Sequence, residues 1–258
     1  MNYYVADAFA ETPFSGNPAG VCILDEALDE ALMQKIAGEN NLAETAFIVP
    51  RADGDYDLRW FTPATEIDLC GHATLASAFI LHEVLGMDKA VYRFHTRSGL
   101  LEVTPKGGLY EMDFPAWPPE PVEITPAMRR AFGGVLEAHW RRDLILVLEN
   151  EAAVRNYQPD FTAIAAVPDA FGIAITAKGE AYDFVSRMFA PNQGIPEDPV
   201  TGSTHSILIP LWAERIGKNT LLARQLSARG GTLYCENRGA RVKISGRARL
   251  YLKGELFV

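Results

Sequence analysis

The most uniform apolar stretch of the chain lies between Gly71 and Gly86, where Ala, Leu, Phe and Ile fill most positions. Placed on a helix, these residues cover most sides rather than one stripe, which is typical of a buried helix. The pattern therefore predicts a buried helix over 72–85, ended by a left-handed glycine at Gly86.

A second apolar stretch, between Gly202 and Gly217, repeats the first at an offset of 131 positions in a chain of 258 residues. It predicts a second buried helix over 203–216. At the offset of 131, Glu66 corresponds to Glu197, Cys70 to Thr201 and His72 to Ser203, and at an offset of 132 Arg97 corresponds to Arg229. A register of this length indicates an internal duplication.

Short apolar runs bounded by turn residues surround both helices and predict strands. In the first half they lie at 3–9, 20–24, 45–49, 56–61, 91–95, 100–103 and 110–114, with a helix near 29–38. In the second half they lie at 143–148, 172–176, 182–189, 222–227, 232–235 and 241–245. Pro210 should bend the second buried helix or leave one backbone carbonyl unpaired.

These elements predict an α+β fold with two pseudo-symmetric lobes, each a mostly antiparallel sheet or barrel wrapped around a central apolar helix. Five of the thirteen residues in 114–126 are proline, which is typical of a linker. We therefore expect the first lobe over 1–115 and the second over 123–246. Residues 247–258 form one strand more than the repeat requires, and we expect them to complete the first lobe.

Composition narrows the class of protein. Hydrophobic residues at 48% and charged residues at 22% are ordinary globular values. A net charge of −9 argues against nucleic acid and against an anionic membrane surface as partners. Three cysteines, no apolar run of the ~18 residues that a membrane span requires, and no signal peptide at the N-terminus favour a cytoplasmic location.

Each predicted buried helix begins at a glycine, Gly71 or Gly202. A helix start leaves about four backbone amides unpaired with a partial positive charge, and a glycine lets a ligand approach them closely. Two such starts facing one another across a pseudo-twofold axis would bind an anionic group such as a carboxylate. Taken singly, each glycine is better explained as a plain turn residue, and the occurrence of two such glycines favours a site.

Polar side chains gather at both helix starts, namely Asp68, Cys70 and His72 at the first and Asp198, Thr201, Ser203 and His205 at the second. An aspartate before a helix is more often a cap than a catalyst, and a histidine in an apolar helix is often a core residue. The core interpretation is the better one for His205. Asp198, held between Glu197 and Pro199, is less expected of a simple cap.

Glu44 stands out because the duplication does not repeat it. It precedes the apolar strand at 45–49, and the local offset of 126 places Ala170 opposite it. Burial beside that strand would disfavour the charged form of the carboxylate, which suits a general acid/base. A partly exposed glutamate at a sheet edge is the alternative interpretation.

Four motifs together resemble the PhzF-like isomerases of the phenazine biosynthesis family, which have a diaminopimelate epimerase-like fold. They are DAFAETPFSGNPAGV, NNLAETAFI, FTPATEIDLCGHATLASA and MFAPNQGIPEDPVTGSTH, and the resemblance runs along nearly the whole chain. It implies a cofactor-independent isomerase in a biosynthetic process, acting on a small carboxylated substrate and assembled as a homodimer.

The resemblance also implies roles for individual residues. Glu44 would be the proton-shuttling acid/base, with His72 and Asp198 as further catalytic residues. The substrate carboxylate would be bound at the helix starts, by the residues Gly71, Gly202 and Ser203, with Cys70 and Thr201 beside them.

The pair Cys70 and Thr201 departs from the pattern of the better-known epimerases of this fold, which have a cysteine at each helix start. A threonine hydroxyl is a very poor base at neutral pH. The sequence therefore favours one-base chemistry, in which Glu44 removes a proton from carbon and returns it elsewhere on the same face.

The expected function is thus a proton shift on an amino-acid-like or cyclic amino carboxylate substrate. One alternative is a non-catalytic protein that binds amino acids. Another is a serine hydrolase using Ser203, which the absence of a GxSxG motif disfavours. We expect no metal and no cofactor, because His72, His205, Asp68 and Asp198 lack a recognised ligand spacing and no glycine-rich phosphate loop is present.

Overall fold

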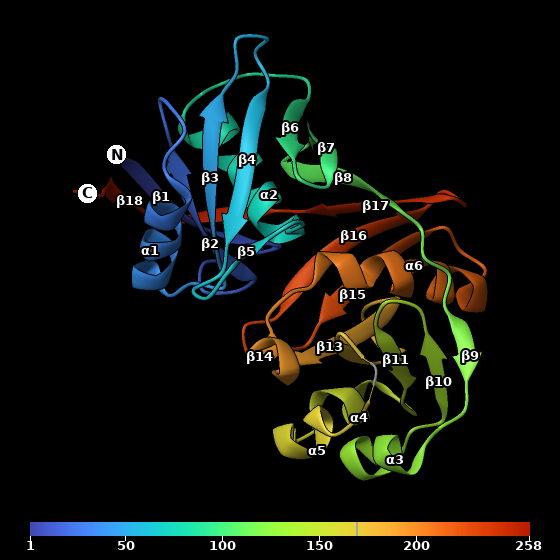
Figure 1. The fold of residues 1–258 in the computed structure, drawn as a ribbon. Coiled ribbons are helices and arrows are strands. Elements are labelled where there is room, and N and C mark those ends of the chain that lie inside the picture. The colour runs from blue at the N-terminus through green and yellow to red at the C-terminus, as the bar shows by residue number, and fades with distance from the viewer. Residues whose placement is uncertain (169) are drawn as a thin grey trace. The chain divides into compact units, whose positions relative to one another are not determined.

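The structure of the protein, a computed structural model, describes residues 1–168 and 170–258 and divides the chain into two units (Figure 1). Unit 1 contains Met1–Asp113 and Ser245–Val258, and unit 2 contains Phe114–Ile244. Strands and short helices surround a central apolar helix in each unit. The predicted α+β class is therefore confirmed.

Strands make up most of unit 1. They are β1 (Asn2–Ala8), β2 (Asn17–Ile23), β3 (Glu44–Pro50), β4 (Tyr56–Phe61), β5 (Glu66–Ile67), β6 (Tyr92–Thr96), β7 (Gly99–Lys106), β8 (Leu109–Pro115) and β18 (Ala248–Glu255). Strand β1 pairs antiparallel with both β2 and β18, and β3–β4, β6–β7 and β7–β8 are antiparallel. The pairs β2–β3 and β4–β6 are parallel, so the antiparallel expectation holds for most pairs only.

The central helix of unit 1 is α2 (Gly71–Phe79), which continues as the π-helical turn η1 (Ile80–Val84). All residues of α2 from His72 onward are buried, and the helix packs against β1, β2, β3, β7 and β18. Helix α1 (Glu30–Asn40) packs against Tyr3, Cys22 and Phe47. Because side chains alternate along a strand, the neighbours of these residues face α2.

Unit 2 repeats this plan with additional short elements. Its strands are β9 (Glu120–Val122), β10 (Glu137–Trp140), β11 (Leu144–Val147), β12 (Ile173–Lys178), β13 (Phe184–Ala190), β14 (Ile195–Asp198), β15 (Thr220–Gln225), β16 (Gly231–Asn237) and β17 (Arg241–Gly246). Its helices are α3 (Pro126–Phe132), α4 (Glu151–Arg155), α5 (Phe161–Ala165), α6 (Gly202–Ile216) and the 3-10 turn η2 (Pro191–Gln193). The short α4, α5 and β10 were not predicted, since they are too short for a clear period.

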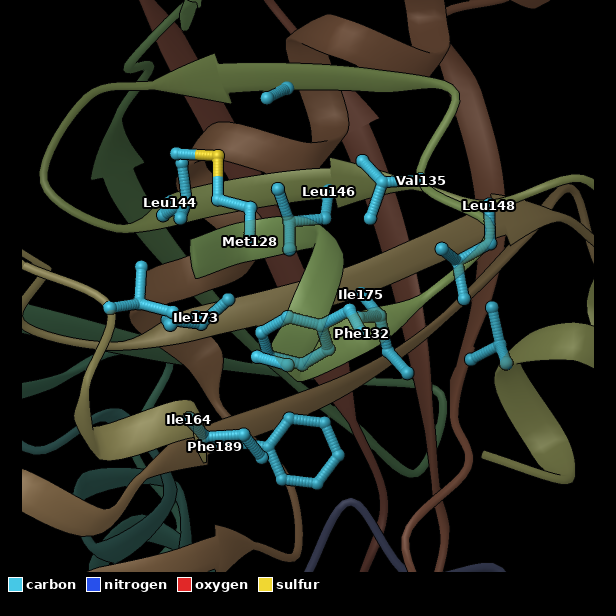
Figure 2. Packing of buried hydrophobic residues seen from close by; sticks show 14 of the residues in the cluster. Met128, Phe132, Val135, Leu144, Leu146, Leu148, Ile164, Ile173, Ile175 and Phe189 are labelled. Carbon is cyan, nitrogen blue, oxygen red and sulfur yellow. The ribbon is translucent and has the colours of Figure 1, made fainter. Parts of the chain in front are cut away.

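Strand β13 separates two apolar layers in unit 2. On one face Phe184 stacks on Trp212 of α6, with ring centroids 5.9 Å apart. On the other face Phe189 packs with Phe132 of α3 and with Ile164 of α5 (Figure 2). Helix α6 therefore occupies one side of the sheet and the short helices occupy the other.

Helix α6 runs through Pro210 without ending. Proline has no N–H, so the carbonyl four residues earlier, on Ser206, loses its helical partner. The backbone N–H of Trp117 donates to that carbonyl at 2.9 Å. The segment 114–126 is thus more than the linker expected from its prolines, because it satisfies α6 and contains β9, which pairs with β10.

The three cysteines, Cys22, Cys70 and Cys235, are buried free thiols. Burial raises the pKa of Cys22 to about 12 and raises that of Cys235 as well, so both are neutral and inert at physiological pH. In the described part of the chain, no helix combines the length and apolar character needed to cross a bilayer.

His205 is a core residue, as the sequence favoured. Its ring is fully buried against Phe184, and its Nδ1–H donates to the carbonyl oxygen of Thr201 at 2.8 Å. Burial lowers the pKa of His205 to about 4, so the imidazole stays neutral in the folded protein.

The buried His205 predicts acid sensitivity. Between pH 6.5 and pH 4 the unfolded chain binds a proton at this histidine and the native protein does not, so stability falls as the pH falls through that window. Between pH 7 and pH 4.5 we expect the free energy of unfolding to drop by about 2.5 kcal/mol more in the wild type than in His205→Asn. Urea unfolding at pH 7 and pH 4.5 measures this, with His82→Asn as control. Equal drops in wild type and His205→Asn would contradict it.

The central helix of unit 1 makes a second prediction. Leu75 of α2 is completely buried, whereas Leu250 on β18 is 40% exposed. We expect Leu75→Ala to lower the free energy of urea unfolding by about 2–5 kcal/mol because it leaves a cavity. Leu250→Ala should change it by roughly 0.5 kcal/mol or less. A similar loss in both variants would show that α2 is not the centre of the core.

Candidate functional site

In unit 1 the structure brings together three of the predicted site residues, Glu44, Cys70 and His72. The carboxylate Oε2 of Glu44 lies 3.0 Å from Nε2 of His72, and Sγ of Cys70 lies 3.5 Å from Nδ1 of His72. Each of the three is only 6% exposed. Glu44 is therefore a buried carboxylate and not the exposed edge residue of the alternative interpretation.

The fold explains how Glu44 reaches His72. Glu44 is the first residue of β3, and Phe47 on the same strand packs towards α1. Alternation along the strand puts Glu44 on the opposite face, which α2 covers. His72 lies in the first turn of α2 and Cys70 is its N-cap residue, so the acid and its partners come from two rigid elements.

The structure adds Asn17, which lies within the first family motif but was not predicted as a site residue. Gly16 before it has φ +72°, and a Cβ at that position would lie 2.1 Å from the carbonyl oxygen of Ala8, so the turn requires glycine. The turn returns the chain into β2, where Asn17 pairs with Ala8 and is completely buried. Its Nδ2 lies 3.3 Å from Nδ1 of His72. The signal for Asn17 was its place in the first family motif.

Opposing effects set the protonation of His72. Burial alone lowers its pKa, whereas the adjacent Cys70 and Glu44 raise it, and the net direction is well above the usual value of 6.5. Burial raises the pKa of Cys70, and the charge of Glu44 raises it further, so Cys70 is a neutral thiol. A neutral thiol carries no charge, so we take the Glu44 carboxylate as the neighbour that raises the pKa of His72.

Asn17 suits either protonation state of His72. A neutral His72 accepts at Nδ1 from the amide nitrogen of Asn17, and a protonated one donates from Nδ1–H. Turning the Asn17 amide by half a turn exchanges its nitrogen for its oxygen at the same position. The contact with Asn17 therefore orients the imidazole ring of His72.

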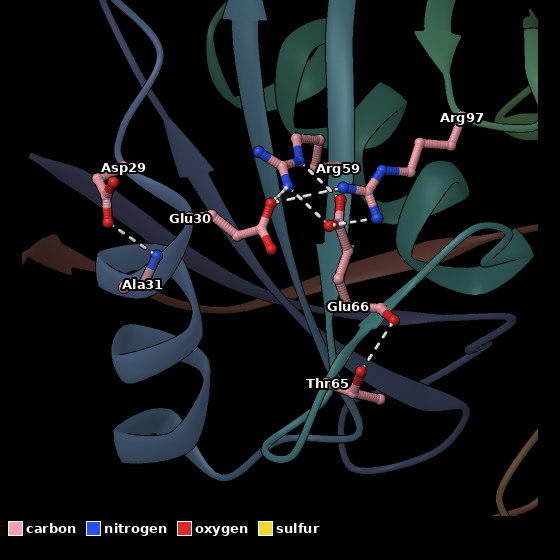
Figure 3. Close-up of polar contacts among 7 residues, drawn as sticks. All are labelled: Asp29, Glu30, Ala31, Arg59, Thr65, Glu66 and Arg97. Atoms are coloured by element: carbon pink, nitrogen blue, oxygen red, sulfur yellow. Dashed lines mark hydrogen bonds and ion pairs between the residues drawn. The ribbon is translucent and has the colours of Figure 1, made fainter.

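An ion-pair cluster fixes the segment that leads into α2 (Figure 3). Arg59 of β4 grips Glu66 of β5 with two contacts of 2.6 Å, and Arg97 binds the same carboxylate at 2.6 Å. Glu30 of α1 completes the cluster through Arg59. The Glu66 side chain is only 7% exposed, so this cluster is a structural anchor rather than a surface pair.

Unit 2 repeats the anchor. Arg187 of β13 binds Glu197 of β14 through two contacts of 2.7 and 2.9 Å. Glu197 lies four residues before Thr201, the N-cap residue of α6. The matched glutamates Glu66 and Glu197 thus recur for a structural reason. Residues that differ between the copies are the better candidates for chemistry.

Strand register identifies the residue of unit 2 that is equivalent to Glu44 in the repeat. Thr45 pairs with Phe61 in unit 1, and Ile173 pairs with Phe189 in unit 2. The equivalent of Glu44 is then Gly172. The expectation of Ala170 was wrong by two positions because the offset is 128 throughout both hairpins: Tyr56 pairs with Pro50, and Phe184 pairs with Lys178. Glu44 remains a carboxylate without a counterpart.

In unit 2 the predicted residues Asp198 and Thr201 lie together. The Thr201 hydroxyl donates to the Asp198 carboxylate, and Gln225 links both through contacts of 2.9 Å from the Thr201 N–H and 2.8 Å to the Asp198 carbonyl. Gln225, which is 1% exposed, was not predicted because an amide in a strand gives no sequence signal. Gly202 is buried and Ser203 is half-buried in the first turn of α6.

The starts of α2 and α6 differ from other helix starts in the described chain. Side chains of Asp29, Thr125, Asn150 and Asp160 cap the amides of α1, α3, α4 and α5. Cys70 and Thr201, the N-cap residues of α2 and α6, make no such hydrogen bond. Asp68 is exposed and does not cap α2, contrary to the usual role of an aspartate there. The two central helices thus keep start amides that no N-cap side chain occupies.

Two groups of side chains in the described residues have metal-binding donors within 4.8 Å of one another. One is the buried cluster Glu44, Cys70 and His72. The other is an exposed cluster on unit 1, formed by Asp53, Asp55 and His95. Neither group was visible as a ligand spacing in the sequence, because distant segments supply its members.

Known proteins resemble this chain over nearly its whole length. The sequence profile described as "Phenazine biosynthesis-like protein" matches residues 6–254. A protein of Pseudomonas aeruginosa named as an uncharacterized isomerase is 50% identical over 258 residues, which cover 99% of this chain and 98% of the relative. A crystal structure of a PhzF-family phenazine biosynthesis protein from Enterococcus faecalis has 49% identity and a TM-score of 0.97, covering 100% of this chain and 99% of its own.

A more distant structure extends the fold beyond close relatives. A hydroxyproline epimerase from Agrobacterium vitis has a TM-score of 0.62 at 10% identity, covering 98% of this chain and 91% of its own. At that identity the likeness concerns the fold alone. The family profile matches residues 6–254, and a relative shares 50% of its residues with this chain. The chain therefore belongs to the PhzF-like isomerase family.

Proposed function

We propose that the protein is a one-base isomerase that shifts a proton between two carbon positions of a small carboxylated substrate. The observation that carries the proposal is the buried contact of 3.0 Å between Glu44 and His72. A carboxylate kept out of water and paired with a histidine can accept a proton from carbon and return it, as a general acid/base requires.

One base is favoured over two because the second position lacks a suitable group. In the repeat, Gly172 is the equivalent of Glu44, and Thr201 is the equivalent of Cys70. Cys70 itself has a raised pKa, so little thiolate is present at neutral pH. A mechanism that needs two thiolates therefore has no support, and the proton is expected to leave and return on one face.

His72 is proposed to adjust the proton affinity of Glu44 during turnover. While Glu44 is charged, the protonated His72 stabilises it. When Glu44 takes the substrate proton, His72 loses its anionic partner, and when Glu44 returns the proton to the substrate, the charged pair is restored. Asn17 contacts the other ring nitrogen of His72 and orients the imidazole.

The substrate carboxylate is proposed to bind at helix-start amides. The uncapped first turns of α2 and α6 offer N–H groups with a partial positive charge, which suit an anion despite the net charge of the chain. In unit 2, Ser203 adds a hydroxyl and Asp198 an acceptor for a polar group such as an amine.

A serine hydrolase has less support. His205, two residues after Ser203, donates its Nδ1–H to the Thr201 carbonyl and is completely buried. Such a histidine is a core residue and not a base for Ser203. A non-catalytic carboxylate-binding protein remains the rival that experiment must separate from an isomerase.

The test is hydrogen exchange into carbon. The full chain is incubated in D2O with a panel of amino acids and of unsaturated and aromatic amino carboxylates, and deuterium at carbon is followed by NMR. We expect exchange with at least one compound, reduced about 100-fold or more in Glu44→Gln because the variant cannot take up the proton. Glu102→Gln is the matched control, since Glu102 is an exposed carboxylate of unit 1.

The outcomes separate the two functions. Exchange that persists at the wild-type rate in Glu44→Gln contradicts the assignment of the base. Tight binding of a carboxylate that is equal in wild type and Glu44→Gln, with no exchange in either, supports the binding protein instead.

A further inference from the structure

We propose that a surface cavity at the end of the helix formed by α2 and η1 binds the primary ammonium group of a small aliphatic amine. The cavity has a volume of about 240 Å³ and lies within unit 1, between η1, the chain that follows η1 and the turn between β7 and β8. A helix rises about 1.5 Å per residue, which places His82 about 15 Å along the axis from His72. The cavity is therefore separate from the cluster around Glu44, and its ligand does not depend on the isomerase function.

The cavity forms where the helix changes its winding. Residues Ile80–Val84 form a π-helical turn, a rare conformation that is frequent at functional sites. The lining of the cavity includes His82, Glu83, Asp88, Pro105, Leu109 and Tyr110. The π-helical turn thus supplies two neighbouring polar side chains of the lining.

His82 presents an acceptor nitrogen. Its Nδ1 lies 3.1 Å from the hydroxyl of Tyr92, and that hydroxyl donates its own proton to the backbone carbonyl of Met87. Tyr92 therefore accepts from His82, which places the proton of the neutral imidazole on Nδ1. The other nitrogen, Nε2, is then an acceptor, and it lies 4.0 Å from the carboxylate Oε1 of Glu83. A donor nitrogen at about 2.9 Å from each of these two acceptors fits between them.

A buried hydroxyl in the lining also lacks a partner. Tyr110 is 2% exposed, and its hydroxyl oxygen makes no hydrogen bond within the described residues. Its ring meets the ring of His82 edge to face, with centroids 6.1 Å apart. Burial raises the pKa of Tyr110, and the nearby charge of Glu83 raises it further, so the phenol is neutral. A ligand that donates to this group satisfies a polar atom that is costly to leave unpaired.

Charge selects a cation for this cavity. The carboxylates of Glu83 and Asp88 belong to its lining. The cavity also lies at the C-terminal end of a helix, where the backbone carbonyls carry a partial negative charge. An ammonium group supplies both the positive charge and the hydrogen-bond donors that these acceptors lack.

Two lysines of the lining do not change this selection, because their ammonium groups have other partners. Lys89 donates to the carbonyl of Gly54, and its Nζ lies 4.6 Å from the centre of the Tyr56 ring. Nζ of Lys106 lies 3.9 Å from the carboxylate of Glu111. An anionic ligand would have to draw these groups away from their contacts, whereas an ammonium ligand leaves them in place.

The remaining lining suits a short aliphatic chain. Pro105 and Leu109 provide apolar surface beside the polar groups. The volume of about 240 Å³ is below the roughly 300–1,000 Å³ of sites for drug-sized ligands, so the ligand is small. A chain of four methylene groups with an ammonium at each end matches these features, because Asp88 offers a carboxylate to the second ammonium. We therefore choose 1,4-diaminobutane as the probe.

The experiment is an NMR titration of the full chain with 1,4-diaminobutane at constant ionic strength. At about pH 8 a primary amine is charged and an ordinary histidine is neutral. We expect the free protein to show a proton on Nδ1 of His82 and none on Nε2. The imidazole signals of His82 should then shift saturably, with a Kd on the order of 1 mM or lower. 1,4-Butanediol has the same chain without charge, and butanedioate carries the opposite charge, so neither should cause a saturable shift.

Variants assign the contacts. Glu83→Gln removes the charge of a side chain that is 54% exposed and should weaken binding at least about tenfold. Tyr110→Phe removes only the hydroxyl and should weaken binding roughly threefold to tenfold. The matched controls are Glu102→Gln and Tyr251→Phe, which change exposed residues outside the cavity and should bind as the wild type does. Circular dichroism melting checks that all four variants fold.

Three results would overturn the site. They are the absence of a saturable His82 shift at about 20 mM 1,4-diaminobutane, an equal affinity for 1,4-butanediol, and an unchanged affinity in Glu83→Gln. Because the measurement is binding at His82, it does not involve deuterium exchange at Glu44. Failure of the amine site and failure of the isomerase are thus separate outcomes.

Discussion

The buried pair of Glu44 and His72 is the constraint on which the arrangement of unit 1 depends. Two ionisable groups out of water are costly unless each is held against its partner. Strand β3 positions Glu44, helix α2 positions His72, and Asn17 contacts the His72 ring. The Arg59–Glu66 ion pair fixes the chain just before α2. A buried pair contributes little to stability in itself, so its retention in this position is best understood through its chemistry.

Duplication separates structure from chemistry in this chain. The arginine–glutamate anchors occur in both units because each must hold a strand at the entrance to a central helix. Both helices also begin without a side-chain cap. Glu44 and His72 have no ionisable counterparts, since Gly172 and Ser203 stand at the equivalent positions. The asymmetric residues are therefore where the reaction is expected, and the symmetric ones are where the fold is built.

The sequence predicted what depends on long periods and on repetition. Both central helices and the α+β class follow from the apolar stretches between paired glycines and from the short strands around them. For Glu44 the sequence left burial and partial exposure at a sheet edge both open. It could not reveal Asn17 or Gln225, because their contacts bring distant segments together. The equivalence of Glu44 with Gly172 was missed for a related reason, since only the pairing of each strand with its neighbour reveals the offset of 128.

The central claim is that the negative charge of Glu44 raises the pKa of His72. NMR titration of the His72 imidazole tests this claim most directly. In the wild type we expect His72 to titrate above 6.5, and in Glu44→Gln we expect its pKa to fall, since burial then acts without the opposing carboxylate. A pKa of His72 at or below 6.5 in the wild type, or one unchanged in Glu44→Gln, would contradict the account.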